Sequence, residues 1–176
     1  MCSLIEIFKR ANAIFLRENK SSLEYDLSEP CLCHSLAKSI QAEMVDTDFE
    51  GYYDDIEYNR DFGGKIKIIT AEAERQIPIK CNLLIHNRGE GERFNNILAL
   101  EMKKSCRSKE EKDNDRIRLM ALTQCRDIYN AEIFTFPEQI CGYQLGIYYE
   151  IDKDKRQILI EYYKNGQKFD SKVLNY

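Results

Sequence analysis

The chain reads IKCNLLIH at residues 79–86 and ILALEMKK at residues 97–104, two apolar stretches separated by a loop that contains glycines. Each stretch is short and rich in Leu and Ile, which predicts a mostly buried strand. The second stretch ends in charge, because Glu101 and Lys103 stand two residues apart and therefore point to the same side of a strand. Charged side chains are costly to bury without partners. The pair therefore lies either at an exposed strand end or in a site.

The N-terminal part of the chain has the residue spacing of two helices. Ser3 and Glu6 have the form of a capping box, and apolar residues then recur at helical spacing until the polar residues 17–22. A second helix is expected to open at Ser28. Glu29 and Pro30 stand in its first turn, where an acid and a proline both fit.

The remaining chain alternates between strand and helix patterns. Polar and apolar residues alternate at 55–59, which predicts a strand, and a return strand is expected at 65–69. A helix is expected at 109–126, where the residues at helical spacing are Ile117, Met120, Ala121 and Gln124. Strands are expected at 143–151, 157–164 and 169–174, the last two joined by the Asn165-Gly166 turn.

This order of elements predicts an α/β domain with one central mixed β-sheet flanked by helices. The chain is expected to form a single domain over residues 1–176. Within it we expect the N-terminal helices at about 3–44, the core sheet and its helix at about 53–150, and a C-terminal hairpin at about 157–174.

The composition is that of an ordinary globular protein, with 43% hydrophobic and 32% charged residues. Lys and Arg number 26 against 30 Asp and Glu, a formal net charge of −4, which argues against coating nucleic acid through bulk charge alone. No stretch approaches the roughly 20 apolar residues of a membrane helix, and the first residues lack the pattern of a signal peptide. We therefore expect a cytoplasmic protein without membrane association.

The cysteines give little support to a disulfide or zinc framework. There are 7, an odd number, and no Cys-x-x-Cys pair occurs. Cys31, Cys33 and His34 suggest zinc by their proximity, but a structural zinc site needs a second ligand pair, and the other His, His86, has only Cys81 near it. Cys31, Cys33 and His34 are therefore expected to be small residues on a helix face.

A local basic stretch stands out within this acidic chain. Its members are Lys103, Lys104, Arg107, Lys109, Lys112, Arg116 and Arg118. Four acidic residues between positions 110 and 115 dilute it, which is typical of a solvated helix with mixed ion pairs. A surface for nucleic acid is the other interpretation.

The stretch that ends at Lys103 resembles the core of the PD-(D/E)xK nuclease superfamily, the restriction-endonuclease-like fold. In that pattern one strand carries an acid and the next ends in an acid, any residue and lysine, which Glu101-Met102-Lys103 matches. Three further stretches resemble elements of small bacterial members. The first helix is matched by SEP at 28–30 with HSLA at 34–37, the first strand by DIEYNR at 55–60, and the helix after the lysine by DRIRL at 115–119. The resemblance covers roughly residues 28–150 and implies a restriction-endonuclease-like core.

The resemblance also implies a metal site for hydrolysis of phosphodiester bonds. A Mg²⁺ or Mn²⁺ ion would activate water and neutralise charge in the transition state. Glu101 would bind this metal, Lys103 would position the water or the scissile phosphate, and Glu29 would be an outer ligand. In the family, an aspartate occupies the main metal position, and this chain has Asn82 there. The side-chain carbonyl oxygen of Asn82 carries no charge, whereas Mg²⁺ prefers anionic oxygen ligands.

Two functions follow from the resemblance and stay open. One is a Mg²⁺-dependent nuclease acting on DNA or RNA, with Lys104, Arg107 and Lys109 near the nucleic-acid backbone. The other is the same fold with a disabled site, which binds nucleic acid or protein; Asn82 is the residue that divides the two. Specificity is expected from loops, from a homodimer or from a protein partner. A third interpretation is an unrelated α/β domain that matches by coincidence.

Other polar residues have a site interpretation and a structural one. His86, four residues after Asn82 on the same strand face, would contact phosphate or assist proton transfer, or would be a hydrogen-bonded structural histidine. Glu57, Asn59 and Arg60 would reach the site or form a cross-strand polar network. Tyrosines of the late strands would stack on bases, although β-propensity alone accounts for them.

Overall fold

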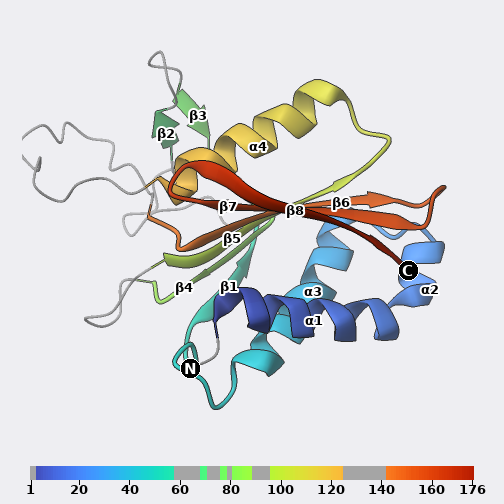
Figure 1. Ribbon diagram of the computed structural model, residues 1–176, viewed down its shortest axis with the longest axis horizontal. Helices are drawn as coiled ribbons and strands as arrows, with labels where there is room; N and C mark the ends of the chain where they lie inside the picture. The colour runs from blue at the N-terminus through green and yellow to red at the C-terminus, as the bar shows by residue number, and fades with distance from the viewer. Residues whose placement is uncertain (1–2, 58–67, 71–75, 79–80, 89–95, 125–141) are drawn as a thin grey trace, which may run out of the picture.

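The centre of the molecule is a mixed six-stranded sheet with helices on both faces (Figure 1), which confirms the predicted α/β class. The computed structural model describes residues 3–57, 68–70, 76–78, 81–88, 96–124 and 142–176. In sheet order the strands are β1 (Tyr53–Ile56), β4 (Leu83–His86), β5 (Asn96–Lys104), β6 (Leu145–Asp152), β7 (Gln157–Lys164) and β8 (Gln167–Asn175). The neighbours β5 and β6 are parallel, and the other pairs are antiparallel.

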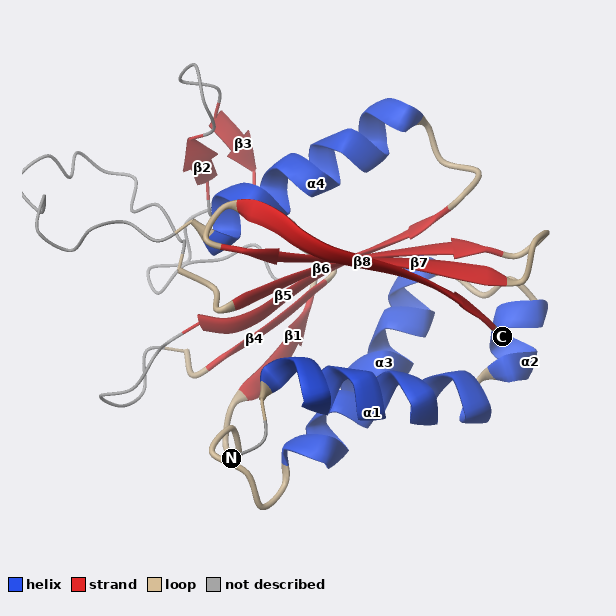
Figure 2. Ribbon diagram, viewed as in Figure 1, coloured by secondary structure: helices blue, strands red, loops and turns tan. Residues whose placement is uncertain are grey.

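The helices divide between the two faces of this sheet (Figure 2). The helices α1 (Leu4–Glu18) and α3 (Glu29–Met44) cover one face, and α4 (Lys109–Thr123) covers the opposite face. The short α2 (Lys20–Glu24) follows α1 directly and was not predicted, because the polar run at 17–22 indicated only a helix end. Two further strands, β2 (Ile68–Thr70) and β3 (Gln76–Pro78), pair with each other in a separate sheet.

Local signals explain where the helices begin. The Ser3 hydroxyl accepts a hydrogen bond from the Glu6 N–H while the Glu6 carboxylate bonds back to Ser3, so the predicted capping box is confirmed. The second helix opens after Ser28 as predicted, with Glu29 and Pro30 in its first turn. The helix α4 has a capping box of the same kind, between Ser108 and Glu111.

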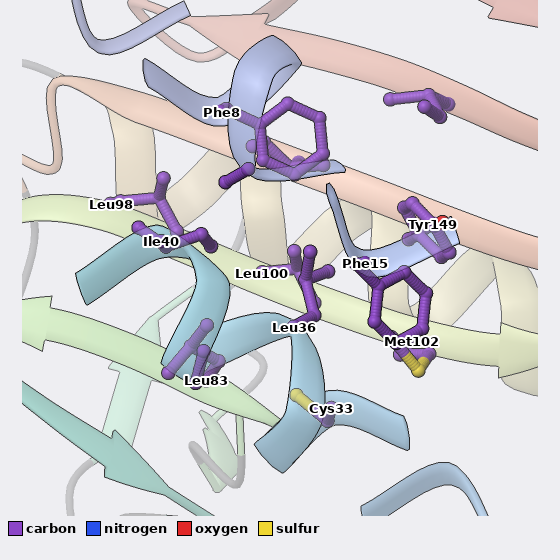
Figure 3. Close-up of a cluster of buried hydrophobic side chains, with 14 of the residues drawn as sticks. Phe8, Phe15, Cys33, Leu36, Ile40, Leu83, Leu98, Leu100, Met102 and Tyr149 are labelled. Atoms are coloured by element: carbon purple, nitrogen blue, oxygen red, sulfur yellow. The ribbon is translucent and has the colours of Figure 1, made fainter. Parts of the chain in front are cut away.

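The larger part of the core lies between the sheet and the pair α1 and α3. Figure 3 shows Phe8 and Phe15 of α1 and Leu36 and Ile40 of α3 packed on β5. The strand presents alternate residues to this core, Leu98, Leu100 and Met102. The intervening Ala99 packs on the other side with Leu119 and Leu122 of α4. By the same alternation, Glu101 and Lys103 face α4.

Three details of the prediction differ from the structure. The return strand expected at 65–69 is observed at 68–70 as β2, which pairs with β3 and not with β1. The predicted strand at 55–59 is instead β1, which ends at Ile56, because Glu57 has a φ of 52° and thus leaves the extended conformation. The residues expected at helical spacing on α4 pack only in part: Met120 and Ala121 lie against the core, whereas Ile117 is exposed. The buried face of α4 also carries Asp115, Leu119 and Leu122. Residues 58–67, with Asn59 and Arg60, residues 79–80 and residues 125–141 lie outside the described residues.

Among the residues that the structure describes, no helix combines the length and apolar character needed to span a membrane.

Candidate functional site

Asn82 and Glu101 lie side by side where β4 begins. Leu83 pairs with Leu100 in the antiparallel ladder, so the preceding Asn82 stands opposite Glu101. The Asn82 backbone N–H donates to Glu101 Oε2 at 3.3 Å, and the Asn82 side-chain Oδ1 accepts from the Met102 N–H at 2.9 Å. The structure thus brings together two of the predicted site residues. The Asn82 amide extends the strand ladder through its side chain.

Glu101 is a buried acid of β5, a strand whose other buried residues are apolar. Only 1% of the residue is exposed. Its Oε1 accepts a hydrogen bond from Arg118 Nη1 of α4. Burial raises the pKa of Glu101 to about 7, although the Arg118 guanidinium lowers it, and the nearby Asp115 carboxylate raises it further. The net direction is upward because desolvation outweighs the attraction to a single cation.

Lys103 and Asp115 complete a group that we call the four-charge cluster: Glu101, Lys103, Asp115 and Arg118. Asp115 Oδ1 lies 3.1 Å from Arg118 Nη1, and Asp115 Oδ2 lies 3.0 Å from Lys103 Nζ. Burial lowers the pKa of Arg118, but the Glu101 and Asp115 carboxylates outweigh this and raise it above its ordinary value. Two strand residues of the predicted motif are therefore both paired with α4.

Sequence reasoning did not assign Asp115 and Arg118 to the site. They stand three residues apart on α4, in register with Leu119 and Leu122 on the face that packs against the sheet. A search for apolar spacing passes over them because they are charged. The available signal was the position of two opposite charges on the buried stripe of the helix after the motif.

Glu29, the predicted outer ligand, holds a different part of the molecule. Its Oε1 accepts hydrogen bonds from the Lys104 backbone N–H at 3.0 Å and from Arg107 Nε at 3.2 Å. It therefore fixes the turn between β5 and α4 to the start of α3. One turn further along α3, burial raises the pKa of the Cys33 thiol, and the carboxylates of Glu101 and Glu57 raise it further. Cys33 therefore lies close enough to Glu101 and Glu57 for their charges to act on its thiol, whereas Glu29 is held at Lys104 and Arg107.

The predicted basic stretch is largely engaged in ion pairs. Beyond Lys103, Arg107 and Arg118, the pairs are Lys104 with Asp26 at 2.9 Å, Lys112 with Glu150 at 2.9 Å, and Arg116 with Glu161 at 2.7 Å. Lys109, in the first turn of α4, is exposed. These contacts are those expected for a helix with mixed ion pairs, and they reduce the positive charge available to a phosphate backbone.

His86 lies in a second polar group, at the edge strand β1. Its Nε2 lies 2.7 Å from Asp55 Oδ2, and Arg88 Nε donates to the same oxygen at 3.0 Å. Burial raises the pKa of Asp55, but its hydrogen bonds to Arg88 and His86 outweigh this and hold it below its ordinary value. This is the structural interpretation of His86.

Glu57, just beyond β1, donates its backbone N–H to the Asn82 carbonyl.

The remaining candidates have packing roles in the structure. Cys33 is buried against the core, whereas Cys31 of the same helix is exposed. Five late tyrosines are at most 2% exposed, so their rings are not presented for base stacking: Tyr143, Tyr148, Tyr149, Tyr162 and Tyr163. Among the described residues, no group of three or more His, Cys, Asp or Glu side chains is arranged to hold a metal ion.

Comparison with known proteins adds no family. No family model, curated protein or solved structure matches the chain.

Proposed function

We propose that this chain is a restriction-endonuclease-like protein with a disabled catalytic site, which binds nucleic acid without cleaving it. One observation carries the proposal: both carboxylate oxygens of Glu101 are occupied by groups of the protein itself. Oε1 binds Arg118, and Oε2 binds the Asn82 N–H.

The metal site implied by the resemblance does not fit these contacts. Mg²⁺ requires oxygen ligands in near-octahedral geometry, preferably with anionic ligands among them. Asn82 Oδ1 is used by the Met102 N–H, and Glu29 Oε1 is used by Lys104 and Arg107. Each of the three predicted ligands already accepts hydrogen bonds from the protein, and Arg118 places a positive charge on the Glu101 oxygen that a metal would use. We therefore assign no hydrolytic step to this arrangement.

The proposed ligand is nucleic acid, bound beside the four-charge cluster. The side chain of Arg107 is 49% exposed, and Lys109 is exposed in the neighbouring turn. Both can reach a phosphate group without disturbing Glu101. Because Arg107 shares its charge with Glu29 and the whole chain is acidic, we expect weak binding that falls steeply with salt.

A second candidate function is a Mg²⁺-dependent nuclease. The observation that favours it is the proximity of Asn82 and Glu101, with Lys103 on the same face of β5. That function would require Arg118 to leave Glu101. The same experiments separate the two candidates.

Cleavage and binding should be measured on labelled single- and double-stranded DNA and RNA with Mg²⁺ or Mn²⁺. We expect no cleavage by the wild type, by Glu101→Ala or by Lys103→Ala. We expect oligonucleotide binding that is weakened severalfold in Arg107→Ala combined with Lys109→Ala. Lys172→Ala, on the exposed edge strand β8, is the matched control and should bind like the wild type.

Two results would change the conclusion. Cleavage by the wild type that is lost in Glu101→Ala and in Lys103→Ala would establish the nuclease. Failure to bind any oligonucleotide at low salt would exclude nucleic acid as the ligand and favour a protein partner. Circular dichroism of every variant should confirm that it is folded.

A further inference from the structure

Arg118 Nη1 lies in a position that bridges two buried carboxylates. It contacts Glu101 Oε1 and lies 3.1 Å from Asp115 Oδ1. The two acids come from different elements, β5 and α4, and are 1% and 4% exposed. One nitrogen of Arg118, whose side chain is 14% exposed, is therefore held between oxygens of two buried acids.

The guanidinium is used here as a point charge. Arginine commonly binds a carboxylate through two parallel N–H groups, but both acids contact the same nitrogen, Nη1. Within the part of the chain that the structure describes, the buried Arg118 Nε and Asp115 Oδ2 make no hydrogen bond, although Lys103 lies 3.0 Å from that oxygen. Buried polar atoms are normally hydrogen-bonded, so the planar shape of arginine does not explain this position.

We infer that Arg118 supplies a built-in cation at a position that takes a hard divalent cation once the guanidinium is removed. Its protein ligands are Glu101 Oε1 and Asp115 Oδ1, and waters complete the coordination. Mg²⁺ and Mn²⁺ suit such a site, because Mg²⁺ is commonly held by one or two carboxylates with several waters. The position differs from the one implied by the resemblance, since Asp115 replaces Asn82 and Glu29.

Charge balance explains why the wild type does not need this ion. Above the pKa of Glu101, where this acid is ionised, the four-charge cluster holds two anionic and two cationic side chains, so it is neutral while Arg118 is in place. Removal of Arg118 leaves an excess negative charge that Lys103 alone does not balance. A divalent cation is then attracted to a buried anionic site, where Coulomb interactions are weakly screened.

This inference rests on the proposed function and deepens it, because it names the cation that Glu101 binds in a protein without a catalytic metal. It concerns the binding of a cation, and its readout is thermal stability and ion stoichiometry. Cleavage by the wild type would refute the proposed function and leave these measurements unaffected.

The test compares the wild type, Arg118→Met and the double variant Glu101→Gln with Arg118→Met, each melted in EDTA and in increasing Mn²⁺. Arg118→Met should melt below the wild type in EDTA, because it leaves buried acids uncompensated. Mn²⁺ at a hundredfold excess over its Kd should raise the Tm of Arg118→Met by about 5–10 °C. Neither the wild type nor the double variant should shift. Electron paramagnetic resonance should count one bound Mn²⁺ per chain in Arg118→Met alone.

The opposite results overturn the inference. One is a Tm shift in Arg118→Met no larger than in the wild type, and another is an equal shift in the double variant, which would place the ion away from Glu101. If Arg118→Met is unfolded in EDTA, it should refold when Mn²⁺ is added. An Arg118→Met protein that stays unfolded in Mn²⁺ also refutes the proposed position.

Discussion

Replacement of Glu101 by glutamine should change how the stability of the protein depends on pH. The pKa of Glu101 is raised from 4.5 to about 7 in the folded state. Between these values the folded protein holds a proton that the unfolded chain releases, so the free energy of unfolding falls as pH rises. Glutamine removes this titration. We therefore expect Glu101→Gln to gain stability relative to the wild type as pH rises from 5 to 8.

The size of the effect follows from the distance between the two pKa values. At about 1.4 kcal/mol per pH unit, the full gap corresponds to roughly 3 kcal/mol, of which about 2–3 kcal/mol appears between pH 5 and 8. Urea unfolding of both proteins at several pH values measures the difference directly. The absolute cost of the substitution at one pH is less informative, because Arg118 also loses its charged partner.

Glu161→Gln is the matched control for this measurement. Burial raises the pKa of Glu161, but hydrogen bonds from Arg116 and Tyr163 outweigh it and leave the pKa below its ordinary value. Its stability contribution changes only in acid, so the difference between Glu161→Gln and the wild type should be constant from pH 5 to 8. A constant difference for Glu101→Gln, or one of opposite sign, would mean that Arg118 keeps Glu101 ionised and would refute the upward direction of its pKa.

Three further predictions address the fold around the site. Leu100→Ala removes a fully buried side chain of the core in Figure 3 and should lower the free energy of unfolding, measured in urea, by about 2–5 kcal/mol. The control Val173→Ala, on an exposed strand, should change this free energy by less than about 0.5 kcal/mol. Gly146→Ala should cost about 1–3 kcal/mol in the same assay, because its Cβ would lie 2.8 Å from Thr123 Cγ2 and 3.0 Å from Tyr163 Cβ; a neutral result would show that α4 can shift away from β6. Asp55→Asn should destabilise the protein by about 1–3 kcal/mol at pH 7, and thermal melts should show the two proteins converging as pH falls below about 4, since the lowered pKa of Asp55 contributes stability only while the carboxylate is ionised.

Much of the fold could be predicted because the signals were local. The capping box at Ser3, the acid and proline after Ser28 and the Asn165-Gly166 turn each act within a few residues, and the helices and the hairpin follow from them. The end of β1 could not be predicted, because Glu57 adopts a left-handed φ that is uncommon for a glutamate. The face of α4 was predicted only in part, for a different reason: two of the positions that face the sheet, Asp115 and Arg118, carry charge.

The candidate site was predictable only along the strands. Alternation placed Glu101 and Lys103 on one side of β5, and the resemblance brought Asn82 beside Glu101, where its backbone N–H now binds the carboxylate. The pairing with α4 joins Glu101 to a residue 17 positions away, and it depends on how the helix is rotated on the sheet. Leu119 and Leu122 set that rotation by packing on Ala99, and they turn Arg118 toward the strand.

The ion pairs to α4 make this helix the element that decides whether the motif can bind anything else. Glu101 binds Arg118, Lys103 binds Asp115, and Asp115 and Arg118 also bind each other. A ligand that took one of the strand residues would therefore break a pair with the helix and leave a buried charge unbalanced, which costs several kcal/mol unless the ligand supplies the missing charge. A divalent cation at Glu101 would compete with Arg118, and a phosphate at Lys103 would compete with Asp115. The ion pairs with Arg118 and Asp115 thus neutralise Glu101 and Lys103, so that a ligand gains little by binding to either residue.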